Sequence, residues 1–322
     1  MGPEGRAERG APTVSIVTPV YNTARWLADC LEASLAQTFG DFELLVSDNA
    51  STDGSLEIAE RFARKDPRVR VFAEREHLAQ TDNFNRALRR IHPGSRYCKM
   101  VLADDRMHPD CLEKLVAVAE IRADVGLVSS QFVENGVVLG TGLATDRSVF
   151  DGREVCREQL LRGSFYFGNN SVVLYRADLV RARQPFYDPV MLHDDTDAAY
   201  RILASHDLGF VHEPLVTLGY DDRSISGSVR ELNPRGLDKL GVILVHGRTF
   251  LSEDEYRACL EAHERKYYRA FARAVLSRRR AAYVEYHRRG LERIGYRLSI
   301  PRLAGCVARE LGRRAPWIRS RS

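Results

Sequence analysis

The sequence lacks the features that mark several large classes of protein. It has no run of roughly 18 consecutive apolar residues, the length that a membrane-spanning helix needs. Residues 1–12 are polar and rich in Gly, Glu and Arg, so we expect no secretion signal and a disordered tail. The six cysteines have no close pairs and no metal-type spacing, which predicts reduced, packed thiols and no cysteine-based zinc site.

What is present is typical of a soluble globular protein. In 322 residues, 44% are hydrophobic and 29% are charged, which favours one large domain with an appendage. The net charge of +4 hides an asymmetry, because residues 264–322 contain 17 Lys/Arg and four Asp/Glu. That segment carries +13 and the rest of the chain −9, so an acidic body and a basic tail should have different partners.

The first half alternates apolar, β-rich runs with helical patterns. Strands are predicted over residues 14–18, 42–47, 69–72, 97–102 and 125–130, and helices over residues 25–37, 53–65, 81–90 and 109–122. This alternation implies an α/β fold with a mainly parallel central sheet flanked by helices. Ligands bind at the carboxyl ends of such strands, so the loops after residues 18, 47 and 102 are the places to search.

The second half is less regular. Its pattern weakens over residues 137–153, then predicts a helix over 154–161, a strand over 171–175 and a helix over 196–205. Beyond residue 228 the chain reads as wholly helical. We therefore expect a tail at 1–12, a domain at 13–227 and a helical, basic region at 228–322.

Polar residues follow the first two strands. Thr18, Pro19 and Tyr21 suit the rim of a base pocket, although Pro and Asn also occur in plain turns. Asp48 and Asn49 stand where they could hydrogen-bond a base or a ribose. Thr52 or Asp53 is expected to cap the helix that follows.

Two acidic clusters come later. Asp104 and Asp105 end an apolar strand, and adjacent carboxylates repel each other unless a cation such as Mg²⁺ or Mn²⁺ lies beside them; a solvated turn is the alternative. Residues 193–197 (HDDTD) precede a helix, where acidic residues complement the helix dipole. One of these carboxylates could instead act as a general base.

Taken in order, these segments resemble glycosyltransferase family 2, the inverting enzymes with the GT-A fold, which is Rossmann-like. The resemblance extends from about residue 14 to 226, with a nucleotide half at 13–130 and an acceptor half at 131–227. It is carried by VSIVTPVYNTARWL (14–27), SLAQTFGDFELLVSDNASTDGS (34–55), HLAQTDNFNRAL (77–88), VLADDRMHPD (101–110) and MLHDDTDAAYRIL (191–203).

The resemblance implies a role for each matching residue. Asp105 matches the aspartate that binds a metal, Mn²⁺ or Mg²⁺, and Asp104 the aspartate that faces the ribose or the metal. Asp195 matches the catalytic base and Asp194 its acidic neighbour. The nucleotide-binding positions are Thr18, Pro19, Tyr21, Asp48, Asn49, Asn83 and Asp104.

This chain departs from the family pattern at three positions. Asn49 replaces the usual second aspartate, which leaves the preferred base open, and Ala103 replaces the first residue of an acidic triplet. Arg223 stands where many members place a histidine near the metal; it would hold the leaving diphosphate or lie in a solvated turn. Asn169 and Asn170 are expected diphosphate or acceptor contacts.

The resulting hypothesis is a cytoplasmic hexosyltransferase of polysaccharide or glycoconjugate synthesis. It would move a sugar from a UDP-, dTDP- or GDP-linked donor to a glycan or lipid-linked acceptor. The basic tail, 265–322, could lie on the anionic inner face of the membrane or pack as a solvated helical cap, and no nucleic acid partner is expected. The alternatives are a non-catalytic nucleotide-sugar-binding relative and a nucleotidyltransferase, which usually has a Gly-rich loop after its first strand.

Overall fold

The computed structural model describes residues 10–167, 169–191, 193–219, 232, 234–277 and 280–314. The chain forms two compact units. The first holds the residues up to Asp188 together with Asp194–Tyr220, and the second holds Pro189–His193 and the chain from Asp221 onward. The predicted boundary between residues 227 and 228 lies outside the described residues, as does the predicted tail up to residue 9.

The first unit is built on a ten-stranded sheet. Its strands are β1 (Val14–Val20), β2 (Phe42–Asp48), β3 (Val69–Ala73), β4 (Tyr97–Met100), β5 (Arg106–Met107), β6 (Val125–Glu134), β7 (Val137–Leu139), β8 (Val149–Phe150), β9 (Leu174–Arg176) and β10 (Asp207–Thr217). Its helices are α1 (Ala24–Leu35), α2 (Ser55–Lys65), α3 (Gln80–Leu88), α4 (Cys111–Ala119), α5 (Gly152–Arg162), α6 (Ala177–Ala182) and α7 (Asp194–Leu203).

Strand β1 illustrates why these residues form the centre of the sheet. Five of the seven residues of its sequence VSIVTPV are β-branched, and all seven positions of the strand are buried. The strand pairs in parallel with β2 on one side and with β4 on the other. A strand covered on both faces and both edges favours this near-continuous apolar run.

The sheet is only partly parallel. Its order is β3-β2-β1-β4-β9-β6-β10-β5, and the first four strands are parallel to one another. Strand β9 then pairs antiparallel with both β4 and β6. Strand β10 is parallel to β6, but its pairing shifts register around Pro214. The prediction of a mainly parallel sheet therefore holds for the first half of the unit, and the second half is mixed.

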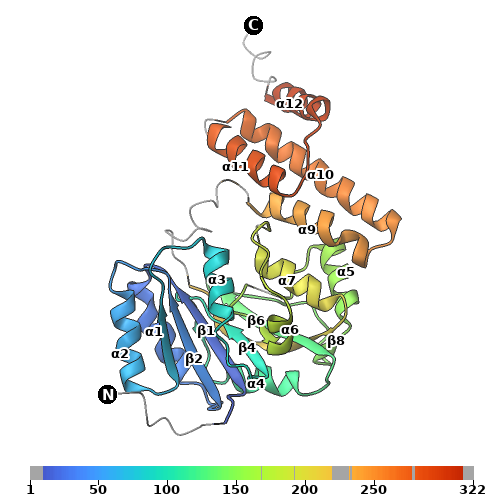
Figure 1. Ribbon diagram of the computed structural model, residues 1–322. Coiled ribbons are helices and arrows are strands. Elements are labelled where there is room, and N and C mark those ends of the chain that lie inside the picture. The colour runs from blue at the N-terminus through green and yellow to red at the C-terminus, as the bar shows by residue number, and fades with distance from the viewer. Residues whose placement is uncertain are drawn as a thin grey trace. The chain divides into compact units, whose positions relative to one another are not determined.

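Helices cover both faces of the sheet. Val14 and Ile16 of β1 share a core cluster with Leu27 of α1 and with Leu112 and Leu115 of α4. Helix α3 packs on β1 and β2, and α6 packs on β4 and β9. Figure 1 shows β1, β2 and β4 as neighbouring arrows with α1 and α2 beside them.

The second unit is helical, as predicted. Its helices are α9 (Pro234–Phe250), α10 (Glu253–Val275), α11 (Arg280–Arg293) and α12 (Ile300–Arg314). Ser252 and Glu255 form a capping box that starts α10. Phe271 and Tyr283 are buried together in a core cluster, with Val275 packed against it. These apolar positions of the basic segment therefore pack inside the unit.

Two expectations from composition can be compared with the described residues. All six cysteines are free, and five of them are buried, which confirms packed thiols. No helix in the described part of the chain has both the length and the apolar character that crossing a bilayer requires.

Candidate active site

The acidic turn after β4 contains a buried carboxylate that lacks a full set of partners. Asp105 is 1% exposed, and its Oδ1 accepts a hydrogen bond from the backbone N–H of Gly219 at 2.8 Å. Its Oδ2 is buried and has no hydrogen-bond partner. Burial and the negative charge of Asp104 raise the pKa of Asp105 to about 7, against the opposing effects of Ser171, Gly219 and Lys99.

This turn has the chemistry of a hard-cation site. A carboxylate oxygen buried without a donor, beside a second carboxylate, is stabilised by a positive ion. Among the described residues, no group of three or more His, Cys, Asp and Glu side chains has a metal-holding arrangement. A divalent ion held by Asp105 and Asp104 would therefore take its other ligands from a substrate and water, as Mg²⁺ usually does.

Residues at the ends of β1 and β2 form the neighbouring part of the edge. Asp48 accepts the N–H of Ser51 at 3.0 Å through Oδ2, whereas its buried Oδ1 has no hydrogen-bond partner. Tyr21 is 45% exposed, and its ring lies 4.1 Å from that of His77. The pair offers an aromatic surface to a ligand. Thr18 is completely buried, so it lies beneath this surface.

Asn49 is committed to the protein itself. Its Oδ1 accepts the N–H of Leu78 at 2.8 Å, and its Nδ2 donates to the carbonyl of Leu78 at 2.9 Å. Nδ2 also lies 3.2 Å from His77 Nδ1. Asn49 thus fixes the loop that carries His77, the ring that lies against Tyr21.

The loops after β1 and β2 are locked together by strained residues. Asn22 and Ala50 have positive φ angles of 52° and 59°, a conformation that non-glycine residues adopt at a cost. Asn22 Oδ1 accepts the N–H of Thr52 at 2.8 Å. Asp53 accepts the N–H groups of Ser55 at 3.0 Å and Ala24 at 2.9 Å, so one carboxylate serves the first turns of α2 and α1.

The second acidic cluster begins α7. Burial raises the pKa of Asp195 to about 6, while hydrogen bonds from Thr196 and the backbone of Asn170 act in the opposite direction. Asp194 accepts the hydroxyl of Thr81 on α3 at 2.9 Å. The third carboxylate, Asp197, is bound to Arg201 at 2.7 Å. Asp197 therefore stabilises the helix, and Asp194 and Asp195 remain for chemistry.

One short turn contacts both acidic clusters. The backbone N–H of Asn170 lowers the pKa of Asp195 and the hydroxyl of Ser171 lowers the pKa of Asp105, so each of these groups lies near its carboxylate. Consecutive Cα atoms are about 3.8 Å apart, so these adjacent residues bring the two carboxylates, 90 positions apart in sequence, to the same segment. The two clusters therefore belong to one site.

The remaining predicted residues have mixed surroundings. Asn83 on α3 is 4% exposed, and its Oδ1 has no hydrogen-bond partner. Asn169 Oδ1 accepts the N–H of Ser171 at 2.9 Å within its own turn, and Asn170 Oδ1 accepts the hydroxyl of Tyr187, which connects that turn to a distant segment. Pro19 is buried within β1. Arg223 lies outside the described residues.

The sequence analysis missed four residues that shape the site. Ser171, Thr81 and Gly219 are small residues whose importance lies in contacts across the fold, for which the sequence carries no local signal. Lys99 is different, because a lysine inside the apolar strand run 97–102 is a detectable anomaly. Its side chain is completely buried, and burial lowers its pKa to about 8.

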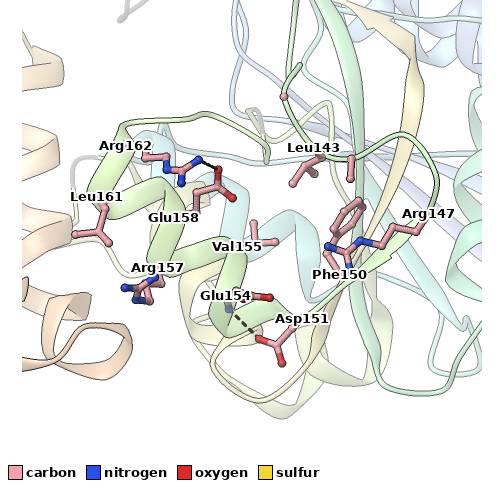
Figure 2. Close-up of a pocket in the computed structure, with 12 residues that line it drawn as sticks. Leu143, Arg147, Phe150, Asp151, Glu154, Val155, Arg157, Glu158, Leu161 and Arg162 are labelled. Carbon is pink, nitrogen blue, oxygen red and sulfur yellow. Dashed lines mark hydrogen bonds and ion pairs between the residues drawn. The ribbon is translucent and has the colours of Figure 1, made fainter.

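A separate hollow of about 520 Å³ runs along α5 (Figure 2). Several charged residues that line it already have partners in the protein. Arg162 pairs with Glu158, and Asp151 caps α5 by accepting the N–H of Glu154. Arg147 lies over the ring of Phe150. None of the predicted site residues lines this hollow, so the residues at the strand ends define the candidate site.

The fold and the acidic residues at the strand ends define a GT-A protein. The chain belongs to Glycosyl transferase family 2, whose model matches residues 15–178. It is similar to the glycosyltransferase GlyG of Streptococcus pneumoniae serotype 4, with 35% identity over 115 residues. This match covers 35% of the present chain and 37% of GlyG, so it spans well under half of that relative.

Two solved structures have the same fold. The mannosyltransferase PcManGT of Pyrobaculum calidifontis, in complex with GDP-Man and Mn²⁺, superposes with a TM-score of 0.57 at 18% identity and covers 94% of this chain and 80% of its own. S. aureus TarS 1–349, in complex with UDP-GlcNAc, gives a TM-score of 0.59 at 15% identity and covers 87% and 79%. At this identity the likeness establishes the fold.

Proposed function

We propose that the protein is an inverting glycosyltransferase that moves a sugar from a nucleoside diphosphate to a hydroxyl of a glycan or lipid-linked acceptor. The observation that carries the proposal is the turn at Asn170 and Ser171, which lies near both Asp195 and Asp105 and lowers the pKa of each. The cation-binding carboxylate, Asp105, and the carboxylate of raised pKa, Asp195, would then border the same substrate-binding site. Such a transfer is consistent with cell-surface polysaccharide or glycoconjugate synthesis.

Asp105 and Asp104 would hold Mn²⁺ or Mg²⁺ together with the donor diphosphate. When bound, the ion would act as a Lewis acid that neutralises charge on the leaving phosphates. Asp105 is suited to this role because its Oδ2 is buried without a partner and Gly219 fixes the orientation of the carboxylate. PcManGT, which has the same fold, was solved with GDP-Man and Mn²⁺.

Asp195 would accept the proton of the acceptor hydroxyl as that oxygen attacks the anomeric carbon from the face opposite the leaving group. One such displacement inverts the anomeric centre and needs no enzyme nucleophile. A base works best when its pKa lies near the working pH, and Asp195 is shifted in that direction. Thr196 and Asn170 orient it, and Asp194 is held by Thr81.

The nucleotide would bind at the ends of β1 and β2. Tyr21 offers its exposed ring for base stacking, and the unpaired Oδ1 atoms of Asp48 and Asn83 can accept hydrogen bonds from the base or ribose. Thr18 and Pro19 would support this surface from below, and Asn49 would hold its His77 side. A UDP-, dTDP- or GDP-linked donor fits this chemistry.

Both alternatives make different demands on the site. A non-catalytic relative would keep the nucleotide surface and lose the base, whereas here both carboxylates are present, Asp194 bound by Thr81 of α3 and Asp195 by the N–H of Thr196. A nucleotidyltransferase usually has a Gly-rich phosphate loop after its first strand. The connection between β1 and α1 here is Tyr21-Asn22-Thr23, without glycine.

The basic segment 265–322 is proposed as a peripheral contact with an anionic membrane. Most of its described apolar residues pack within the second unit, and Ile300 and Leu311 are exposed. This contact would rest mainly on exposed charge such as Lys266 and Arg269. The enzyme would then act at the inner face of the membrane. Arg223, outside the described residues, stays a proposed contact of the leaving diphosphate, and Asn169 would support the acceptor side.

The deciding experiment is a panel of nucleotide sugars scored for Mn²⁺- or Mg²⁺-dependent transfer and hydrolysis. Asp195→Asn should lower kcat by about 10²–10⁴-fold on the active donor, with nucleotide affinity retained. Asp254→Asn, an exposed residue in the first turn of α10, is the matched control and should stay active. Full activity of Asp195→Asn refutes the base, and binding without turnover of every donor supports the non-catalytic alternative.

A further inference from the structure

Lys99 is an unusual residue for the middle of a sheet. It lies on β4 between β1 and β9, with Ile16 and Leu174 as its neighbours in register. The side chain is completely buried, and an ammonium group in such surroundings is costly unless its hydrogens are bonded. A methionine would fill the same volume without that cost. The position therefore calls for an account of what the ammonium does.

The ammonium binds the turn that serves both acidic clusters. Lys99 Nζ donates to the backbone carbonyl of Ser171 and, at 3.3 Å, to that of Val173. The turn is closed by a hydrogen bond from the N–H of Val172 to the carbonyl of Asn169, 3.0 Å long. Lys99 thus fixes this segment from below.

The same segment is connected to the acidic turn through its side chain. Ser171 Oγ accepts the N–H of Leu102 at 2.8 Å, and the Leu102 carbonyl accepts the N–H of Asp105 at 3.0 Å. The Ser171 hydroxyl also lies near the Asp105 carboxylate, whose pKa it lowers. On the other side, the N–H of Asn170 reaches Asp195. A shift of the Ser171 carbonyl would therefore change the surroundings of both carboxylates.

We propose that Lys99 is a positioning residue that sets the relative placement of the cation-binding carboxylate Asp105 and the base Asp195 by clamping the Asn170–Ser171 turn. Lys99 contacts neither the donor nor the acceptor. The inference rests on the proposed function, because it assigns Lys99 a role in that reaction. It adds that the ammonium group of Lys99 sets the positions of both Asp105 and Asp195.

The test compares four proteins. Lys99→Met keeps the length of the side chain and removes all its donors. Ser171→Ala removes the hydroxyl that lies near Asp105 and accepts the N–H of Leu102. Cys98→Ala is the matched control, because Cys98 neighbours Lys99 on β4, is equally buried and pairs in register with Tyr175, outside the Asn170–Ser171 turn. Binding of Mn²⁺, alone and with UDP, is measured by the electron paramagnetic resonance signal of the free ion, alongside kcat, KM and Tm.

Lys99→Met is expected to weaken Mn²⁺ binding about tenfold and to lower kcat about 10- to 100-fold, the range seen when residues supporting metal ligands are replaced. Acceptor KM should change little. Ser171→Ala should weaken Mn²⁺ binding with a smaller loss of kcat, because the Asn170 contact to Asp195 remains. Cys98→Ala should lower Tm and leave Mn²⁺ binding and kcat close to those of the unmodified protein.

The proposal is overturned if Lys99→Met changes Tm alone, as the control does. If Lys99→Met does not fold, Ser171→Ala decides, and unchanged Mn²⁺ binding in that variant overturns the clamp. If the unmodified protein transfers no sugar from any donor, the proposed function has failed, while Mn²⁺ binding still reports whether Lys99 and Ser171 position Asp105.

Discussion

The raised pKa of Asp195 should determine how kcat/KM depends on pH. Its folded pKa of about 6 lies above the ordinary aspartate value of about 3.9 because the side chain is buried. A base must be ionised, so kcat/KM should rise about tenfold per pH unit below about pH 6 and level off above it. A pH–rate series measures this directly, and a flat profile between about pH 5 and 7 would contradict the assignment of Asp195.

Ionised Asp105 should lower the stability of the metal-free protein. Its folded pKa is raised to about 7, so it favours the folded state while protonated, and this contribution is lost as the pH rises from about 4 to 7. Asp105→Asn should therefore raise the free energy of unfolding of the metal-free protein by about 2 kcal/mol near pH 8 and change it little near pH 5. Denaturant unfolding at both pH values tests the sign.

Asp197 provides the contrast for that measurement. Its carboxylate is paired with Arg201, so Asp197→Asn should destabilise the protein near pH 8 by breaking a buried pair. Added Mn²⁺ should raise the Tm of the unmodified protein and of Asp197→Asn, but not that of Asp105→Asn. A gain of Tm with Mn²⁺ in Asp105→Asn would place the ion elsewhere.

Asn49 tests whether a family residue can be restored. The family pattern has aspartate at this position, yet Asn49 donates to the carbonyl of Leu78 and an ionised aspartate cannot. Asn49→Asp should free the His77 loop, lower stability by about 1–3 kcal/mol and raise donor KM. Nucleotide binding and Tm measure the two effects. A variant with unchanged KM would show that the His77 loop plays no part in donor binding.

At the scale of elements, the segment after β10 must lie against the acidic turn. A Cβ on Gly219 would come within 2.0 Å of the carbonyl oxygen of Asp104, which is backbone and cannot yield cheaply. Gly219→Ala should displace the turn and lower kcat/KM by about 100-fold, with weaker Mn²⁺ binding. Gly40→Ala, where a Cβ meets nothing within 4 Å, is the control and should be nearly neutral in both assays.

The elements also show how far the sequence alone could reach. The regular strand–helix alternation predicted β1 to β4, because parallel strands covered on both faces must be apolar. The sequence analysis did not predict β10, whose run DLGFVHEPLVT contains charged residues and a proline. The pairing of β10 with β6 shifts register on both sides of Pro214. Such a β-bulge can be recognised only when the partner strand is known.

The site was predicted unevenly for the same reason. Asp104, Asp105 and Asp195 stand at element ends, where a sequence pattern points to them. Asn49 and Asn170 were predicted as ligand contacts, but their amides bind Leu78 and Tyr187, partners that only the fold supplies. The role of Lys99 could not be predicted from sequence, because its carbonyl partners at Ser171 and Val173 lie more than 70 residues away.

At the scale of the whole molecule, the basic segment should bind anionic vesicles through charge. Lys266 and Arg269 on α10 are exposed, and each basic residue near such a surface contributes about 1 kcal/mol. Lys266→Glu with Arg269→Glu should lower cosedimentation with anionic vesicles about tenfold or more. High salt should weaken the binding strongly, because it screens the charges and most apolar residues of the unit are already packed.

The control keeps the net charge equal and moves the change to the first unit. Arg61→Glu with Lys65→Glu alters two exposed residues of α2 by the same amount and should leave vesicle binding nearly intact. Equal loss in both variants would mean that total charge, and no particular surface, drives the association. Charge reversal is preferable to truncation here, because removing α11 and α12 would expose the core around Phe271.

The hydrogen bond from Gly219 to Asp105 also has a consequence for synthesis of the chain. The acidic turn leaves the ribosome more than one hundred residues before the segment that orients it. Domains fold as their residues emerge, so the parallel strands can assemble early while this carboxylate still lacks its backbone donor. The newly made chain would complete the proposed metal site at Asp105 only after the whole catalytic unit had been translated.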